Sequence, residues 1–277
     1  MISSHQKAET DWQEILKQQS FSWAAFKIVL HAAEQGQLPD YKGSMLRGGF
    51  GAAFRKVSCT NFNQDCRSCM MNSTCPYAYI FETPNTGDNN VSHQAENLPH
   101  PFVIEPPESG QNHYSTGDDL VFSLILFGKA VPFLPYFIYA FDRMANKGLG
   151  AGKIRFHLSA GFAHQNLENH DELMQIYDGD AQLLNGNFHT WNMQELNLPD
   201  QNPENMRLKI RLITPARLVQ HGKLVQSISF ELFVRTLLRR ISLLAKIHCQ
   251  SDWNVPYAEI LKNARGVHTL QDDTQWY

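Results

Sequence analysis

Positive charge is missing from one long stretch of this sequence. Between residues 156 and 206 there is no Lys or Arg, although eight Asp and Glu occur there. Residues 206–265 show the opposite imbalance, with eleven Lys or Arg against three acidic residues. The net charge of −3 for the whole chain hides this basic segment, which predicts a polyanionic partner. Two solvated faces of opposite charge are the alternative.

Long apolar runs are missing as well. Residues 1–16 are polar and lack an apolar core, which excludes a typical signal peptide. Residues 120–141 are apolar but are interrupted by Lys129, Pro132 and Pro135, so a strand followed by a buried helix explains them better than a membrane span. Hydrophobic residues make up 43% of the chain, as in globular proteins. We therefore expect a cytoplasmic protein without a membrane partner.

The spacing of apolar residues predicts an α+β fold. Helices are expected over residues 43–57 and 131–144, and strands or extended pieces over residues 21–31, 78–82, 101–105, 119–127 and 154–159. The order strand, helix, strands, helix, strand is the ferredoxin-like split βαβ pattern. Residues 21–161 are therefore expected to form an N-terminal ferredoxin-like domain. Three glycines inside the first helix, Gly48, Gly49 and Gly51, suggest close approach of another backbone or of a ligand.

The second half of the chain begins as the first one does. Residues 162–205 are acidic and weakly patterned, and we expect an irregular connector there. Residues 207–214 alternate basic and apolar side chains, as in a half-buried strand, and residues 229–249 have the pattern of an amphipathic helix. Residues 206–277 are thus expected to open a second ferredoxin-like domain, which would be incomplete at Tyr277.

Cysteine is scarce and clustered. Four of the five cysteines, Cys59, Cys66, Cys69 and Cys75, lie within one insertion, residues 59–75, and two of them form a C-x-x-C knuckle. Four thiolates in this spacing predict a closed, structural Zn²⁺ site. A redox C-x-x-C pair is an alternative, although it would not need Cys59 and Cys75. An iron–sulfur cluster, which accepts the same four ligands, is another. Cys249 lies on an apolar helix face and is expected to be a core residue.

The basic residues form two sets that predict a track for RNA phosphates. The first set lies on the first helix and comprises Arg47, Arg55 and Lys56. The second comprises Arg217, Arg235, Arg239 and Arg240, of which Arg235 and Arg239 are one helical turn apart. The alternative is that Glu231 pairs with Arg235 and that the others are solvated surface residues.

RNA cleavage without a metal needs a proton acceptor, a proton donor and a cation. His31, Tyr41 and Lys42 supply these groups at the connection into the first helix, so we expect the catalytic residues there. A lone histidine at a strand end is more often structural, and His100 and His248 are further candidates with no better claim.

A family resemblance covers nearly the whole chain, from about residue 21 to 264. The stretches YKGSMLRGGFGAAFRKVSC, CPYAYIFETP, HPFVIEPP, GDDLVFSLILFGKA and GLGAGKIRFHL resemble the RAMP-superfamily endoribonucleases that process precursor CRISPR RNA. TPARL, GKL and SFELFVRTLLRRISLLAKIHC are similar to the opening of that family's C-terminal domain.

The resemblance implies tandem ferredoxin-like (RRM-like) domains that act in antiviral defence. It implies metal-independent cleavage of precursor CRISPR RNA within repeats, a cyclic phosphate product and hand-over to interference-complex subunits. The family's catalytic histidine, with Tyr or Lys support, matches His31, Tyr41 and Lys42. Its C-terminal glycine-rich loop has no counterpart before Tyr277. A non-catalytic RAMP subunit that binds CRISPR RNA and a zinc-stabilised module that binds protein are the competing hypotheses.

Overall fold

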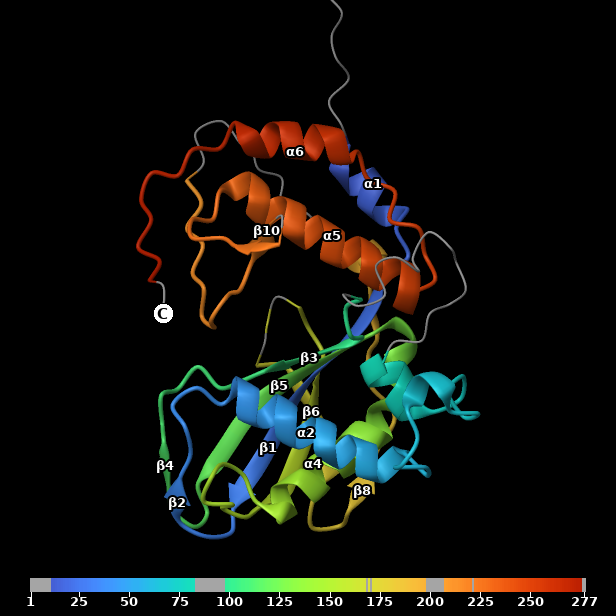
Figure 1. The fold of residues 1–277 in the computed structure, drawn as a ribbon, viewed down its shortest axis with the longest axis vertical. Helices are drawn as coiled ribbons and strands as arrows, with labels where there is room; N and C mark the ends of the chain where they lie inside the picture. The colour runs from blue at the N-terminus through green and yellow to red at the C-terminus, as the bar shows by residue number, and fades with distance from the viewer. Residues whose placement is uncertain are drawn as a thin grey trace, which may run out of the picture.

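A computed structural model describes residues 11–82, 98–167, 169, 171–197, 207–220 and 222–275. The fold is α+β, and one antiparallel sheet with two helices on one face forms most of the core (Figure 1). No helix among these residues is both long enough and apolar enough to cross a membrane. The predicted α+β class is thus confirmed.

The main sheet is built around β1 (Ser22–Ala32). Its strand order is β3 (Phe102–Glu105), β5 (Asp119–Phe127), β1, β6 (Phe156–His164), β7 (Leu173–Asp178) and β8 (Leu183–Leu184). The short β9 (Trp191–Asn192) pairs with the start of β1. Two small ribbons accompany the sheet: β2 (Gly36–Gln37) with β4 (His113–Tyr114), and β10 (Val219–Gln220) with β11 (Lys223–Leu224).

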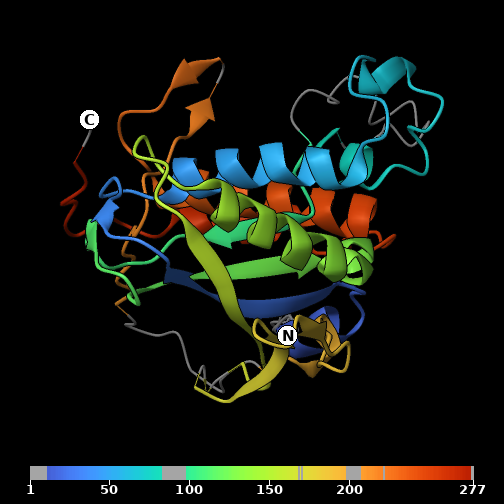
Figure 2. The same ribbon diagram turned by 90° about the horizontal axis from the view of Figure 1, so that it is seen from below.

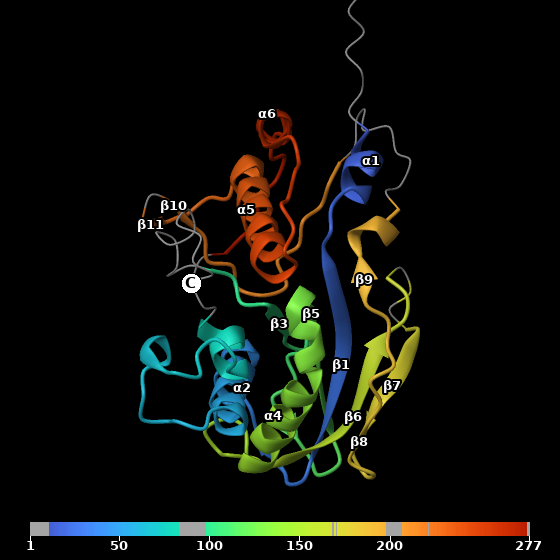
Figure 3. The same ribbon diagram turned by 90° about the vertical axis from the view of Figure 1, so that its right-hand side faces the viewer.

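Two helices, α2 (Gly43–Ser58) and α4 (Leu134–Lys147), lie side by side on one face of the sheet (Figures 2 and 3). The short 3₁₀ helix η4 (Gly128–Phe133) leads into α4. The Phe50 ring stacks on the Phe137 ring at 5.0 Å and also contacts Phe54 and Phe102. A Cβ atom on Gly49 would lie 3.0 Å from the Met144 sulfur, so this helix glycine permits the close approach of α2 and α4.

Alternation along the strands directs one set of side chains toward the helices. In β5 the side chains of Leu120, Phe122, Leu124 and Leu126 are buried, whereas the residues between them are partly exposed. Each buried side chain of this size contributes about 1.5–3 kcal/mol by leaving water. The side chains of the residues in between, in β1, β5 and β6, consequently lie on the opposite face of the sheet.

A second group of helices lies beyond one end of the sheet (Figure 1). It comprises α5 (Phe230–His248), α6 (Tyr257–Arg265), α1 (Trp12–Lys17) and the 3₁₀ turn η5 (Met193–Glu195). The Ser229 hydroxyl caps α5 by accepting a hydrogen bond from the Leu232 amide. The last turn of α5 buries Leu244 and Ala245 against Phe21.

His248 joins α5 to the first half of the chain and is fully buried. Its Nε2 lies 2.9 Å from the Pro99 carbonyl oxygen, which can only accept, so Nε2 carries the proton. Its Nδ1 then accepts from the Tyr79 hydroxyl at 3.1 Å. Burial lowers the pKa of His248 to about 4, so the ring is neutral near pH 7.

Three predicted segments differ from the structure. Residues 78–82 form a π-helical turn, η2 (Ala78–Glu82), because Tyr79 and Phe81 pack on the aromatic core and the segment has no ladder partner there. Residues 207–214 form no strand: alternation alone is insufficient without a neighbouring strand, and Leu208 is 67% exposed. The connector predicted over residues 162–205 instead contains the end of β6 and all of β7, β8 and β9.

Gly128 is the position where the backbone of α5 comes closest to the sheet. Its φ is +51°, and a Cβ atom there would lie 2.1 Å from the His248 carbonyl oxygen. We expect Gly128→Ala to lower the free energy of unfolding by about 2–4 kcal/mol, since it adds a steric clash to an unfavourable backbone conformation. Chemical denaturation measures this. Gly110→Ala, which has open space around it, is the control and should change little.

The buried His248 predicts a pH dependence of stability. Its pKa in the folded state is about 4, below the ordinary value of 6.5, so the unfolded chain binds the proton more readily. The neutral His248 ring therefore contributes about 3 kcal/mol to the free energy of unfolding above about pH 6.5. This contribution is lost as the pH falls toward 4. Denaturation at pH 7 and pH 4.5 should show this loss, and His248→Gln should reduce it. An unchanged slope in His248→Gln would contradict the assignment.

Candidate functional site

A cluster of two histidines and one carboxylate lies across three neighbouring strands. His31 is paired in register with Asp119 of β5 and with His157 of β6. Its Nδ1 makes an ion pair with the Asp119 carboxylate, and its ring centroid lies 5.4 Å from that of His157. Leu30 and Ala32, on either side of His31, are buried in the helix-covered core, so the cluster lies on the opposite face.

The His31 cluster is accessible. The side chain of His31 is 39% exposed and that of Asp119 is 48% exposed. The Asp119 carboxylate lies against Nδ1, so Nε2 is the ring nitrogen of His31 that can take part in proton transfer. The arrangement therefore provides one oriented imidazole and a second imidazole in ring contact with it, as general acid–base chemistry requires.

The other two residues predicted to be catalytic have different surroundings. Lys42 is only 1% exposed, and its ammonium donates to the Asp40 carbonyl at 3.2 Å and lies 5.9 Å from the Tyr114 ring centroid. Burial lowers the pKa of Lys42, and the Asp40 charge opposes this effect. Tyr41 is 46% exposed and lies against Gly43 at the start of α2. The polar contacts of Lys42 are thus separate from those of His31.

The basic residues of the first helix, α2, contact different parts of the molecule. The Arg47 guanidinium lies over the Phe102 ring, 5.0 Å from its centroid. Arg55 lies 5.5 Å from the Tyr77 ring centroid and donates to the Phe62 carbonyl at 3.2 Å, so it faces the cysteine insertion. Lys56 is exposed.

The basic residues of the second half are likewise divided. Arg235 pairs with Glu231, as the alternative interpretation of the sequence predicted, and Arg265 lies 3.1 Å from the same carboxylate. Hydrogen bonding from Arg235 lowers the pKa of Glu231. Arg217, Arg239 and Arg240 are exposed. Arg235 is therefore engaged within its own helix, and the track for RNA phosphates stays a prediction.

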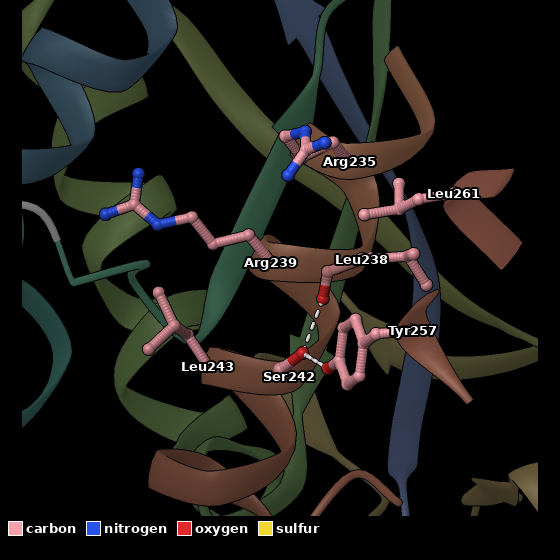
Figure 4. A pocket seen from close by; sticks show the side chains of 7 residues that line it. All are labelled: Arg235, Leu238, Arg239, Ser242, Leu243, Tyr257 and Leu261. Atoms are coloured by element: carbon pink, nitrogen blue, oxygen red, sulfur yellow. Dashed lines mark hydrogen bonds between the residues drawn. The ribbon is translucent and has the colours of Figure 1, made fainter. Parts of the chain in front are cut away.

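A pocket of about 290 Å³ lies between α5 and α6. Arg235, Arg239 and Tyr257 contribute to its wall, and leucines supply most of the remainder (Figure 4). The Ser242 hydroxyl, which contacts the Tyr257 hydroxyl, donates to the Leu238 carbonyl at 2.6 Å. The Ser242 and Tyr257 hydroxyls thus have hydrogen-bond partners within the pocket wall.

Arg47, His100 and Arg240 come together from three separate segments. The charges of Arg47 and Arg240 each lower the pKa of His100, after burial, which is the largest cause. Arg240 also lowers the pKa of Arg47. Three cationic or potentially cationic groups therefore share one region, where α2, β3 and α5 approach one another.

The four clustered cysteines lie in and around the short 3₁₀ turn η1 (Cys66–Ser68), which begins at Cys66 and is followed by Cys69. Burial raises the pKa of the Cys66 thiol, and Glu82, Cys59 and Cys75 raise it further, so three of the four cysteines influence one another. Among the described residues, however, no three His, Cys, Asp or Glu side chains are arranged to hold a metal ion. Cys249 packs with Phe21 and Trp253, in keeping with its predicted core position.

Asp119 and His157 were not identified from the sequence. Both lie in predicted strands, but their proximity to His31 depends on which strands are neighbours and in what register. The alternation in the segments LHA and FHL does place each histidine between apolar residues, which indicates an exposed face, but Asp119 follows another acidic residue in GDDL. The sequence does not show which strands pair, and this pairing is what brings Asp119 and His157 to His31.

Comparison with known proteins provides a family but no activity. No curated protein matches the chain significantly. Residues 21–188 match a family model, AF_1859_N, described as an N-terminal domain. The matched residues include strands β1, β3, β5, β6, β7 and β8 of the main sheet. They also include helices α2 and α4 and the His31 cluster. Because the match covers more than half of the chain, this protein belongs to the AF_1859_N family of N-terminal domains.

Proposed function

We propose that this protein is an endoribonuclease that cleaves precursor CRISPR RNA within repeats without a catalytic metal. The observation that carries the proposal is the contact of His31 with both Asp119 and His157 on the accessible face of the sheet. The sequence resemblance supplies the substrate class, and the basic C-terminal segment is consistent with a polyanionic substrate.

The strand arrangement supports a ferredoxin-like, RRM-like interpretation of the first half. The elements β1, α2, β3, β5, α4 and β6 follow one another as βαββαβ, and they are ordered β3-β5-β1-β6 in the sheet. RRM domains bind single-stranded RNA on the sheet face that the helices leave open. In this protein His31 and His157 lie on that face.

The proposed reaction needs only two proton transfers. One imidazole of the pair takes the proton from a 2′-hydroxyl, whose oxygen attacks the adjacent phosphorus. The P–O5′ bond then breaks, the other imidazole protonates the leaving 5′-oxygen, and a 2′,3′-cyclic phosphate remains. Asp119 holds the His31 ring in the required orientation. Arg155, two residues before His157 and ion-paired with Glu34, supplies a cation at the same end of the sheet.

Lys42 and Tyr41 have other roles in this proposal. The buried Lys42 ammonium stabilises the connection between β2 and α2 through the Asp40 carbonyl and the Tyr114 ring. Tyr41 is exposed enough to contact RNA. The proposal thus keeps His31 from the residues expected to be catalytic and adds His157 and Asp119.

Substitution of the His31 cluster tests the proposal. We expect His31→Ala and His157→Ala each to slow cleavage of a cognate repeat RNA by roughly 10²–10⁴-fold, because each removes one proton-transfer group. Asp119→Asn should slow it less, since the imidazole remains. Cleavage is measured in EDTA with single-turnover kinetics, and a 2′-deoxy substitution at the scissile nucleotide should abolish it.

His113→Ala, on the exposed strand β4, is the matched control and should cleave normally. Cleavage that requires a divalent metal, or that persists in both histidine variants, would refute the proposed chemistry.

A non-catalytic RAMP subunit that binds CRISPR RNA is the second candidate. The exposed positions of Arg239 and Arg240 favour RNA binding regardless of catalysis. Binding without cleavage by the wild-type protein, with affinity that falls steeply as salt rises, would select this candidate. Transfer of the bound RNA to interference-complex subunits is part of both proposals.

We also propose that the cysteine insertion binds structural Zn²⁺. The four thiols form a donor set suited to zinc, but their side chains do not converge in the described structure, so the insertion must rearrange around the ion. Native mass spectrometry should detect one zinc per chain, lost in Cys66→Ser/Cys69→Ser and retained in Cys249→Ser. Failure of the wild-type protein to take up added zinc would contradict this assignment.

A further inference from the structure

Arg47, His100 and Arg240 have no evident structural reason to lie together. Arg47 belongs to α2, His100 immediately precedes β3, and Arg240 belongs to α5. Like charges held in one region repel one another and lower the stability of the fold. Among the described residues, the salt bridges involve neither Arg47 nor Arg240. An anion is therefore the missing partner that would offset the repulsion.

His100 provides a separate observation that also indicates a ligand. Its Nδ1 is buried, and it has no hydrogen-bond partner within the described part of the chain. The same ring hydrogen-bonds to the Ile80 backbone, which fixes its orientation. A buried polar nitrogen without a partner lowers the stability of the fold. An acceptor such as a phosphate oxygen would satisfy a protonated Nδ1.

The surroundings hold one guanidinium in place. Arg47 lies over the Phe102 ring, and this ring also contacts the His100 ring and the Phe50 and Phe81 rings of the aromatic core. A guanidinium stacked on an aromatic ring is restricted in orientation and keeps its N–H groups free for an oxyanion. The site is thus partly organised before any ligand arrives.

We propose that Arg47, His100 and Arg240 form a phosphate-binding site, and that a phosphate group binds there together with a proton on His100. The groups that act on His100 are Arg47 from α2, Arg240 and His248 from α5, and the Ile80 carbonyl from η2. In the free protein burial and the two arginines keep the imidazole neutral near pH 7. Bound phosphate reverses the local charge and favours the imidazolium, so affinity rises as the pH falls below about 6.5.

This site is distinct from the His31 cluster. Phe102 pairs with Leu126 of β5, which pairs with Ala24 of β1, whereas His31 lies seven residues further along β1. At about 3.3 Å per residue the two regions are about 23 Å apart along the sheet. Phosphate binding at the Arg47 site and cleavage at the His31 cluster can therefore succeed or fail independently.

Inorganic phosphate is the first probe. Isothermal titration calorimetry of the whole protein at pH 6 and pH 8, at constant ionic strength, should show one phosphate site that binds several-fold more tightly at pH 6. Arg47→Gln and Arg240→Gln should each weaken binding by tenfold or more. Arg143→Gln, an exposed arginine of α4 that is not among the groups acting on His100, is the control and should bind like the wild type. His100→Gln should bind with a smaller dependence on pH.

A ten-nucleotide RNA without repeat sequence distinguishes the sources of the phosphate group. Weakened RNA affinity in Arg47→Gln and Arg240→Gln, but not in Arg143→Gln, identifies a backbone phosphate as the natural ligand. Unchanged RNA affinity together with lost inorganic phosphate binding identifies a free phosphate or phosphomonoester. Phosphate and RNA affinities that are the same in wild type, Arg47→Gln and Arg240→Gln would overturn the inference, whatever the outcome of the cleavage assay.

Discussion

The central position of β1 is the constraint on which the rest of this structure depends. Hydrogen-bonded to β5 on one side and to β6 on the other, this strand brings together residues 88 to 137 positions apart in sequence. Its alternation buries Phe26, Ile28 and Leu30 against α2 and α4, and it places His31 on the opposite face. A shift of one residue would exchange the two faces, so the apolar core fixes the histidine cluster as firmly as it fixes the strand.

The attachment of α5 is a different kind of interaction. Most of the helix is partly or fully exposed, and only its last turns are held by Phe21, by the neutral His248 and by close approach to Gly128. A fully buried imidazole needs both hydrogen bonds, to Pro99 and Tyr79, to offset its desolvation. This small, specific contact places α5 so that the charge of Arg240 acts on both Arg47 of α2 and His100.

Much of the first half was predictable from sequence because local pattern and tertiary environment agree there. The extents of β1, β5 and α2 differ from the predicted ranges by one residue or not at all, and α5 begins and ends one residue inside its predicted range. The failures have a common cause. Residues 78–82 were expected to be extended and residues 207–214 alternate like a strand, but a strand needs a neighbour. Residues 173–178, by contrast, pair with β6 despite a weak pattern of their own.

The sequence by itself determined the α+β class, the amphipathic elements and the residue types available for chemistry, because spacing along one element is a local property. It singled out His31, the arginines and the cysteine cluster. Only the tertiary structure decided that Asp119 and His157 flank His31, that Lys42 is buried, and that Arg47 and Arg240 share a region with His100. Those relations arise from strand neighbours, register and helix docking, which join residues distant in the chain and which the burial of the whole core selects together.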